Sequence, residues 1–291
     1  MKNNKKTPNL KHYLIFISCL FLFTCVTACF EPETGCLDIE AKNFDPTADE
    51  MCGEDDRQGN CPCTYPVLSI DTIDYLFAKA DFAPNTIYQL EEQFIIIDQI
   101  RFFLSGFQFI RNNSDQVIVA DTISLIVTND EGQQETSIVT DDYILVEQQS
   151  SIDIGAVQES GQFDSLRFVV GIEGNVNTTD PVSVNNSQHP LADASMHFGN
   201  TTDGYIFNQI IIQTDTFSQV QTTINIGTAT NLVEIKLPFS YESPIGSDFS
   251  LGTLHIDHSK WFDGINFVAD NEADIIDKII TNTPTVFSIS P

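Results

Sequence analysis

Basic residues are scarce in this 291-residue chain, which has 13 lysines and arginines against 41 aspartates and glutamates. The formal net charge of −28 repels nucleic acid and anionic lipid head groups, so the composition excludes a nucleic-acid-binding protein. The same charge favours cations such as metal ions, but it also keeps an exported protein soluble. Charge alone therefore does not decide between a metal-binding role and a merely soluble surface.

Enzyme signatures are missing as well. The chain contains no Gly-x-Ser-x-Gly, no His-Glu-x-x-His and no glycine-rich phosphate-binding loop. Adjacent carboxylates such as Asp141-Asp142 are common at this charge, so they carry no information about acid–base chemistry. We therefore expect a binding protein and not an enzyme.

Long apolar runs are absent after the N-terminus. Four lysines in the first eleven residues precede an apolar run at 13–23, shorter than the about 20 residues of a membrane-spanning helix. This order is typical of a secretory signal peptide, and residues 26–29 (Val-Thr-Ala-Cys) resemble the lipobox of bacterial lipoproteins. We expect cleavage of residues 1–28 and lipidation of Cys29, which would anchor the protein to the outer membrane, periplasmic or surface-facing. An ordinary signal peptide or a single membrane anchor with a chance cysteine is the alternative.

Few cysteines are left after export. Four of the seven lie beyond Cys29, and this even number in an oxidising compartment predicts two disulfides: Cys36, Cys52, Cys61 and Cys63. A bridge between Cys61 and Cys63 would be strained, so we expect both to bridge back to the two earlier cysteines. A structural zinc site is the alternative.

Residues 29–66 are expected to form an acidic spacer that contains these cysteines. The segment 35–48 resembles the short acidic cysteine repeats of secreted bacterial surface proteins. Four hard oxygen ligands at close spacing make calcium a candidate cofactor of the spacer: Asp38, Asn43, Asp45 and Asp49. No EF-hand spacing is present, so a disulfide-pinned spacer between the lipid and the domain is the alternative.

Residues 67–291 are expected to form one β domain, because short runs rich in Ile, Val, Phe and Thr alternate with Asn, Asp, Gly and Ser. The predicted strands are 94–97, 102–110, 117–120, 123–128, 163–172, 205–213, 220–226 and 232–239, with a tight turn between the third and the fourth. Isoleucines at helical spacing in 275–280 follow Asn271, a potential N-cap. The predicted fold class is mainly β, an antiparallel β-sandwich with a short C-terminal helical segment.

Several landmarks in order resemble one family. The segments 100–107 (IRFFLSGF) and 163–172 (FDSLRFVVGI) resemble two strands of MbnP-like proteins, the periplasmic copper-associated partners of methanobactin systems. Further matches over about residues 70–265 are Asn175, Asn177, Pro181, His189-Pro190-Leu191, Met196-His197-Phe198 and Gly204-Tyr205. The resemblance implies a copper-binding or copper-handling role, with a protein partner of a copper-handling system.

The departures from the family concern the copper site. Copper-binding relatives are linked to an oxidised tryptophan, and family members usually carry tryptophans between the methionine and the Gly-Tyr element. This chain has His197, Phe198 and Gly199 there, and its single tryptophan is Trp261. The family's His-x-Gly element is Asn225-Ile226-Gly227 here. The resemblance therefore transfers the fold better than the copper chemistry.

Four histidines lie beyond the signal peptide, and imidazole suits copper, while a thioether suits Cu(I). The candidate metal ligands are His197, Met196, His189, His255 and His258. On an extended strand His255 and His258 would point to opposite faces, although a turn could bring them together. A surface or capping role is the alternative for each histidine.

Two hypotheses follow. The chain is an MbnP-like lipoprotein that binds copper or serves a copper-handling system, or it is a metal-free surface lipoprotein that binds a glycan or a protein partner. Calcium in the spacer is compatible with both. If the chain itself binds copper, as the first hypothesis allows, His197 must lie close to another histidine, methionine or carboxylate.

Overall fold

The computed structural model describes residues 32–53, 61–91, 93–111, 115–129, 131–200, 202–214 and 220–290. The expected signal peptide and Cys29 lie outside the described residues. The chain divides into a small unit, of which residues 32–38, 44–53 and 61–63 are described, and a large unit, Ile39–Asn43 and Thr64–Pro291. Within the described ranges, no helix has the length and apolarity to cross a membrane.

Two disulfides hold the small unit together. Cys36 pairs with Cys63 and Cys52 with Cys61, so the prediction of two bridges, neither joining Cys61 to Cys63, is confirmed. The described strands of this unit, β1 (Thr34–Gly35) and β2 (Glu50–Met51), form a two-residue parallel pair. So short a segment buries little apolar surface, and covalent links take over the stabilisation that a core supplies elsewhere.

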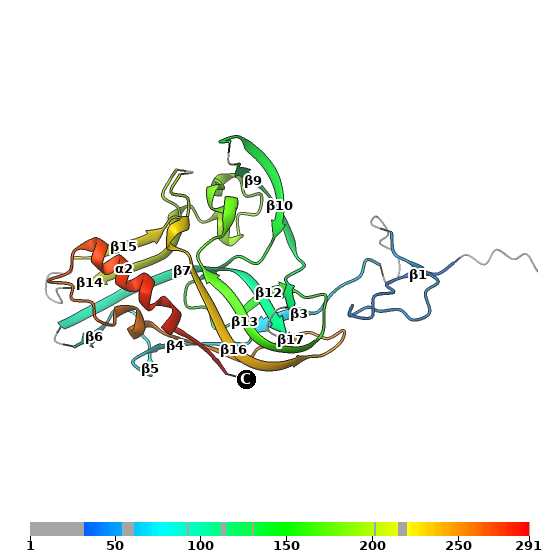
Figure 1. Cartoon of the computed structure of the whole chain (residues 1–291), viewed down its shortest axis with the longest axis horizontal. Helices are drawn as coiled ribbons and strands as arrows, with labels where there is room; N and C mark the ends of the chain where they lie inside the picture. Colours follow the sequence, from blue (N-terminus) through cyan, green and yellow to red (C-terminus); the bar gives the residue numbers. More distant parts are fainter. Residues whose placement is uncertain are drawn as a thin grey trace, which may run out of the picture. The chain divides into compact units, whose positions relative to one another are not determined.

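The large unit is organised around β7 (Gln93–Arg111), the central strand of an eight-stranded sheet (Figure 1). The path across the sheet is β15 (Thr222–Gly227), β14 (Ile206–Gln213), β7, β13 (Gly161–Val170) and β16 (Val233–Ser243). Three shorter strands also pair with β7, namely β6 (Thr86–Leu90), β8 (Asp115–Ile118) and β11 (Ile144–Val146). All these pairings are antiparallel.

A second layer of strands covers one face of this sheet. It contains a four-stranded sheet, β19 (Phe287–Ser290), β18 (Thr253–Asp257), β4 (Thr72–Phe77) and β5 (Ala80–Asp81), and a three-stranded sheet, β12 (Ile152–Ala156), β3 (Val67–Ile70) and β17 (Phe249–Ser250). The ring of Phe287 packs edge-on against Phe102 of β7 and Phe168 of β13, with centroids 5.8 and 5.5 Å apart. The two layers therefore share one apolar core, and the predicted β-sandwich is confirmed.

The other face of the large sheet has a core of its own. Phe102 and Phe103 are consecutive on β7, so they point to opposite faces, and both are fully buried. Phe103 packs with Tyr205, Phe207 and Met196 in this second core. The hairpin of β9 (Thr122–Thr128) and β10 (Gln134–Thr140) contributes Leu125 and Val127 to it, on the opposite side of β7 from β4 and β5 (Figure 1).

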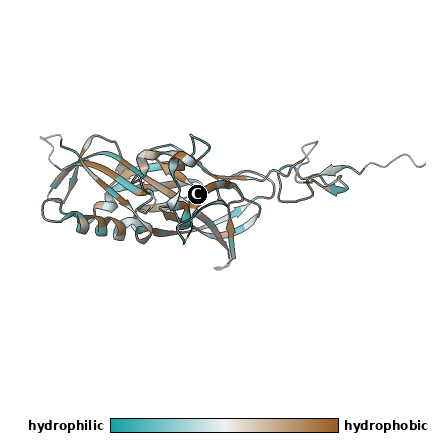
Figure 2. Ribbon diagram, turned by 90° about the horizontal axis from the view of Figure 1, so that it is seen from above, coloured by the Kyte–Doolittle hydropathy of each residue, from teal (hydrophilic) through white to brown (hydrophobic). Residues whose placement is uncertain are grey.

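The predicted C-terminal helix is confirmed as α2 (Glu272–Asn282). Asn271 is its N-cap, because its side-chain oxygen accepts the N–H of Asp274 at 3.1 Å. Ile275 and Ile279 are buried against the sandwich core, and Figure 2 shows apolar and polar residues alternating around the helix. Short 3-10 helices flank it, η6 (His258–Phe262) before it and η7 (Thr283–Thr285) after it.

Two details of the strand prediction were wrong. The runs 94–97 and 102–110 belong to one continuous strand, β7. The runs 117–120 and 123–128 do not form a hairpin, because β8 pairs with β7 while β9 pairs with β10. The reason is the backbone of Ala156, whose carbonyl accepts the N–H of Ala120 and whose N–H is held by the Asp121 carboxylate at 2.7 Å. These bonds hold residues 120–121 against Ala156 of β12, which belongs to the second layer.

Candidate functional site

Residues 174–205 form a loop of four short 3-10 helices over the second core. The helices are η1 (Gly174–Thr178), η2 (Pro181–Ser183), η3 (Pro190–Ala192) and η4 (Ala194–Met196). The last three are capped by Asp180, His189 and Asp193, whose side chains accept a backbone N–H two residues later. Met196 is fully buried beneath the loop. Local capping therefore gives this segment a defined shape without a regular helix or strand.

Four residues that the resemblance singled out hold this loop together: Asn177, Leu191, Gly204 and Tyr205. The N–H of Tyr205 donates to the Asn177 side chain at 2.9 Å, and its hydroxyl donates to the Leu191 carbonyl at 2.6 Å. Gly204 has φ +68°, and a Cβ there would lie 2.1 Å from the carbonyl oxygen of Asn177. A larger residue at this position would push the two parts of the loop apart.

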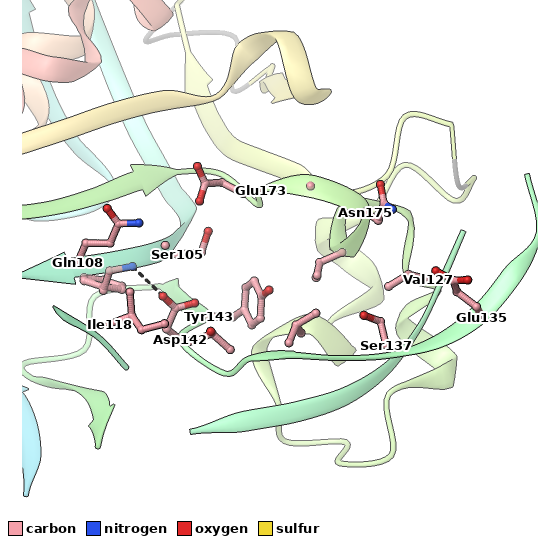
Figure 3. A pocket seen from close by; sticks show the side chains of 16 residues that line it. Ser105, Gln108, Ile118, Val127, Glu135, Ser137, Asp142, Tyr143, Glu173 and Asn175 are labelled. Atoms are coloured by element: carbon pink, nitrogen blue, oxygen red, sulfur yellow. Dashed lines mark hydrogen bonds between the residues drawn. The ribbon is translucent and has the colours of Figure 1, made fainter. Parts of the chain in front are cut away.

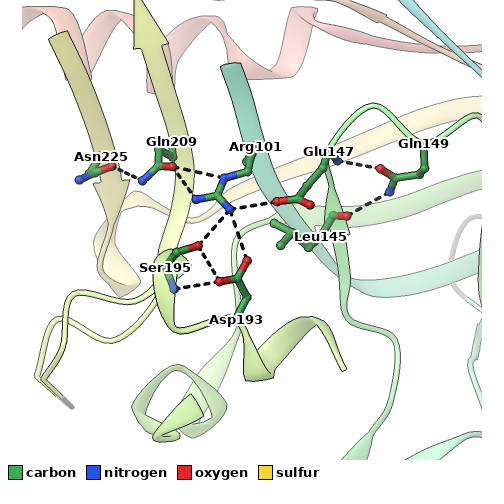
Figure 4. Close-up of polar contacts among 8 residues, drawn as sticks. All are labelled: Arg101, Leu145, Glu147, Gln149, Asp193, Ser195, Gln209 and Asn225. Atoms are coloured by element: carbon green, nitrogen blue, oxygen red, sulfur yellow. Dashed lines mark hydrogen bonds and ion pairs between the residues drawn. The ribbon is translucent and has the colours of Figure 1, made fainter. Parts of the chain in front are cut away.

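Arg101 of β7 fastens the loop to the sheet (Figure 4). Its Nε and Nη2 donate to the side-chain oxygen of Gln209 at 3.3 and 2.7 Å. Its Nη1 lies within 3.3 Å of oxygens from Glu147, Asp193 and Ser195. The arginine side chain is only 11% exposed. Its donors are directed at partners within the protein, so this cation positions the loop and does not present a free charge to a ligand.

A polar row continues from Arg101 across three strands. Gln209 is the register partner of Arg101 on one side and of Asn225 on the other, so the three side chains share one face of the sheet. The Gln209 amide donates to Asn225 Oδ1 at 3.0 Å. The resemblance to MbnP-like proteins aligns Asn225 with a histidine. An amide that completes a hydrogen-bonded row therefore occupies the position where the resemblance would place an imidazole.

His189 uses both ring nitrogens inside the protein. The N–H of Leu191 donates to Nδ1 at 3.1 Å, so the proton of the neutral ring is on Nε2. Nε2 lies 2.8 Å from the Asp141 carboxylate, to which it donates. The ring caps η3 and leaves no lone pair for a metal ion.

His197 is held in the same tautomer. The N–H of Gly199 donates to its Nδ1 at 2.9 Å, and burial lowers the pKa of the ring, with Asp180 opposing the shift. The neutral ring therefore carries its proton on Nε2, which is buried and has no hydrogen-bond partner within the described part of the chain. The ring packs edge-on against Tyr205 at 5.0 Å. An N–H, and not a lone pair, faces the interior.

His255 and His258 lie in the second layer of the sandwich. His255 contacts the Asp74 carboxylate at 3.0 Å through Nδ1 and the Ser290 hydroxyl at 2.9 Å through Nε2, which ties β18 to β4 and β19. His258 is 1% exposed and stacks on Trp261 at 5.3 Å. Its burial lowers the pKa of the ring to about 3, so the ring is neutral at pH 7.

The structure does not bring the predicted copper ligands together into a cage. Met196 and His197 belong to the loop, whereas His255 and His258 belong to β18 and η6. No group of three His, Cys, Asp or Glu side chains within the described ranges could hold a metal ion. The residues therefore do not fit a histidine-bound copper ion in this arrangement.

Three of the predicted calcium ligands accept hydrogen bonds from nearby groups of the protein. Asp45 accepts the N–H and the hydroxyl of Thr47, and Asp49 accepts the N–H of Glu33. Asn43, in the large unit, accepts the N–H of Thr64. Asp38, with Asp45 and Asp49, is part of no three-carboxylate cluster of the described residues. Calcium binding stays a prediction from spacing alone.

Sequence reasoning missed Arg101 and its partners. A detectable signal was present, because an arginine inside the apolar segment 100–107 must find partners for a buried charge. The partners Gln209 and Asp193 lie about a hundred residues further along the chain, and a single sequence does not reveal such pairs.

Comparison with known proteins supports the resemblance. Residues 70–279, more than half of the 291-residue chain, match the family model described as MbnP. One similar solved structure is MbnP from Methylosinus trichosporium, at 11% identity and a TM-score of 0.40, with 69% of this chain and 78% of that chain covered. No curated protein sequence matches the chain. The family match covers the β domain and leaves out the small cysteine-rich unit.

We expect the substitution Arg101→Met to lower the free energy of unfolding by about 2–3 kcal/mol, because it leaves Gln209, Asp193 and Glu147 without their cation. Urea unfolding measures this loss. Arg111→Met is the matched control, since the ion pair of Arg111 with Glu159 is more exposed, at 25% and 52%. The control loss should be about 1 kcal/mol or less. Equal losses in the two variants would contradict a special role of Arg101.

The stability of the protein should depend on pH through His258. The unfolded chain binds a proton at His258 below about pH 6.5, whereas the folded protein binds it only near pH 3. The contribution is therefore complete above pH 6.5 and is lost as the pH falls toward 3. The difference in free energy of unfolding between the wild type and His258→Phe should change by on the order of 1 kcal/mol per pH unit in this window. A constant difference would rule out this titration.

Proposed function

The chain belongs to the MbnP family, and from this premise we propose that it is an exported, lipid-anchored binding protein that serves a copper-handling system in the cell envelope. The family match over residues 70–279 carries the copper-related part of this proposal. The order of lysines, apolar run and lipobox-like Cys29, outside the described residues, supports export and anchoring. The two disulfides agree with an oxidising compartment.

Within this role the geometry favours recognition of a partner over a histidine-bound copper ion. His189 and His255 have both ring nitrogens engaged, and His197 offers an N–H where a ligand needs a lone pair. Asn225 fills the landmark position of the family's histidine with an amide. The copper-related function would then be exerted through a protein partner.

The anchored loop offers a surface for such a partner. Val182 on η2 is 87% exposed and Phe198 beside His197 is 38% exposed, although both are apolar. The caps of the loop and its attachment through Arg101 fix the loop backbone that carries them. Preorganised apolar side chains lose little conformational entropy when they are covered by a partner.

One observation favours a copper ligand in spite of this arrangement. The Nε2 atom of His197 is buried and has no hydrogen-bond partner among the described residues. A shift of the ring proton to Nδ1 would free a lone pair there, but it would break the bond from the Gly199 N–H. Metal binding at His197 would therefore have to offset the loss of that bond.

Copper titration distinguishes a protein that acts through a partner from a protein that itself binds copper at His197. We expect the chain from residue 30 onward to bind Cu(I) and Cu(II) no more tightly than an unrelated acidic protein of equal charge, with the same result for His197→Ala. Metal content and competition with a chromophoric chelator are the measurements. One equivalent of copper that is lost in His197→Ala but kept in His255→Ala would contradict this expectation and make His197 a copper ligand.

The anchor is tested separately. In a bacterial host the wild-type chain should incorporate labelled palmitate and fractionate with membranes, because acyl chains on Cys29 supply the membrane affinity. Cys29→Ser should lose the label and retain its signal peptide. The variant Cys25→Ser, which alters a cysteine inside the signal peptide, is the control and should behave as the wild type. A labelled Cys29→Ser protein would argue against lipidation at this position.

A further inference from the structure

A cavity of about 560 Å³ lies beside the second core of the large unit (Figure 3). Its walls come from β7 at Ser105–Gln108, from the hairpin strand β10, and from the start of η1. Figure 3 shows Asp142 and Tyr143 facing Glu173 across it. A volume of this size suits a small organic molecule.

A β-bulge positions the carboxylate of Asp142 in this cavity. Between β7 and β13, Ser105 pairs with Val169 and Gln108 with Arg167, so β7 has one extra residue, and Gly106 in this stretch has φ +65°. The N–H of Phe107 donates to Asp142 Oδ2 at 2.7 Å. The bulge thus supplies a backbone donor that fixes the orientation of the carboxylate.

The charge of Asp142 has no side-chain counter-ion in the cavity. Asp142 is 5% exposed, and the residues lining the cavity include no lysine, arginine or histidine. The neighbouring cation, Arg167, is used elsewhere, because it pairs with Glu173 at 3.1 Å and with Glu234 at 3.0 Å. A buried carboxylate without a cation is unfavourable, and a ligand that brings a positive charge relieves this cost.

The electrostatic state of Asp142 agrees with this geometry. Burial, together with the charge of Glu173, raises the pKa of Asp142 to about 6, while the N–H groups of Phe107 and Gly106 oppose the shift. The group is therefore mostly ionised at pH 7. A bound cation would lower the pKa again, which gives a direct spectroscopic signal for binding.

Apolar side chains form the rest of the cavity. Val127 and Val176 are at most 5% exposed and line it together with Val139. Alternation along β10 turns Val139 inward, whereas Ile138 points to solvent and is 74% exposed. The ring of Tyr143 stands beside Asp142, where its face can attract a cation.

We propose that this cavity binds a small organic cation, in which an ammonium group is carried on an apolar or aromatic body. The ammonium group contacts the Asp142 carboxylate, and the body lies against Val127, Val139 and Tyr143. A neutral molecule would leave the charge of Asp142 uncompensated. A bare metal ion would leave the apolar walls without a contact and would have a single buried carboxylate as its charged ligand. This site is independent of the copper-related function.

The test uses 2-phenylethylammonium as the probe and the full chain in detergent solution. Calorimetric titration at pH 7.5 should show saturable binding of one equivalent. Asp142→Asn keeps an oxygen that accepts the Phe107 N–H but removes the charge, so it should weaken binding at least about tenfold. The neutral analogue 2-phenylethanol should bind more weakly by a similar factor. Asp153→Asn, which neutralises an exposed carboxylate on β12, is the matched control and should bind as the wild type.

A second measurement keeps the proposal testable if Asp142→Asn fails to fold. In the wild type, the carboxyl ¹³C resonance of Asp142 should titrate with a pKa near 6 without the probe and at a lower pKa with it. Absence of saturable binding, equal affinity of the wild type and Asp142→Asn, or an unchanged Asp142 pKa in the presence of the probe would each overturn the proposal. A probe that binds equally well as its alcohol would do the same.

Discussion

The large unit depends on the burial of both faces of a single strand. β7 has 19 residues, and its consecutive rings Phe102 and Phe103 point into two separate cores. Because each fully buried aromatic side chain contributes about 1.5–3 kcal/mol of transfer free energy, neither face can be left to solvent. The second layer of strands covers one face. The loop 174–205 and the β9–β10 hairpin cover the other face. The polar row of Arg101 and the Asp142 cavity both lie where these two segments meet the sheet.

The burial of β7 explains how much of the fold could be read from the sequence. A strand with one buried face, such as β16, alternates regularly, and its start was predicted within one residue of the observed one. In β7 the inward-facing positions change parity, from Ile95 and Ile97 to Phe102 and Leu104 and back to Phe107 and Phe109. Register shifts against β14 and β13 accompany these changes. A search for a constant period of two residues therefore predicts two short strands, 94–97 and 102–110, in place of the single strand β7.

The hydrogen bonds of the candidate site could not be predicted from the sequence, for a different physical reason. Asn177, His189 and Tyr205, which the resemblance singled out, lie in one loop, and one ring nitrogen of each histidine in this loop accepts a backbone N–H. A histidine two residues before a free N–H at a 3-10 turn acts as a cap, and this depends on local geometry that residue types do not encode. Asp142 was dismissed as one of many acids. Its burial results from the bulge at Gly106, which a composition argument does not detect.

The row of Arg101, Gln209 and Asn225 has a consequence for how this domain could change over evolutionary time. Replacing Asn225 by histidine would leave a single ring lone pair to accept the Gln209 amide, and Gln209 also supplies the oxygen that receives two donors of Arg101. Gly227, two residues further along β15, lies directly under the ring of Phe198, where an added Cβ would come within 2.5 Å of that ring. The carbonyl oxygen of Tyr205 lies equally close to that Cβ, so position 227 requires glycine whatever side chain stands at position 198. A histidine at position 225 that gave its lone pair to a metal ion would withdraw it from the Gln209 amide, so the hydrogen-bonded row and an imidazole ligand compete for this position.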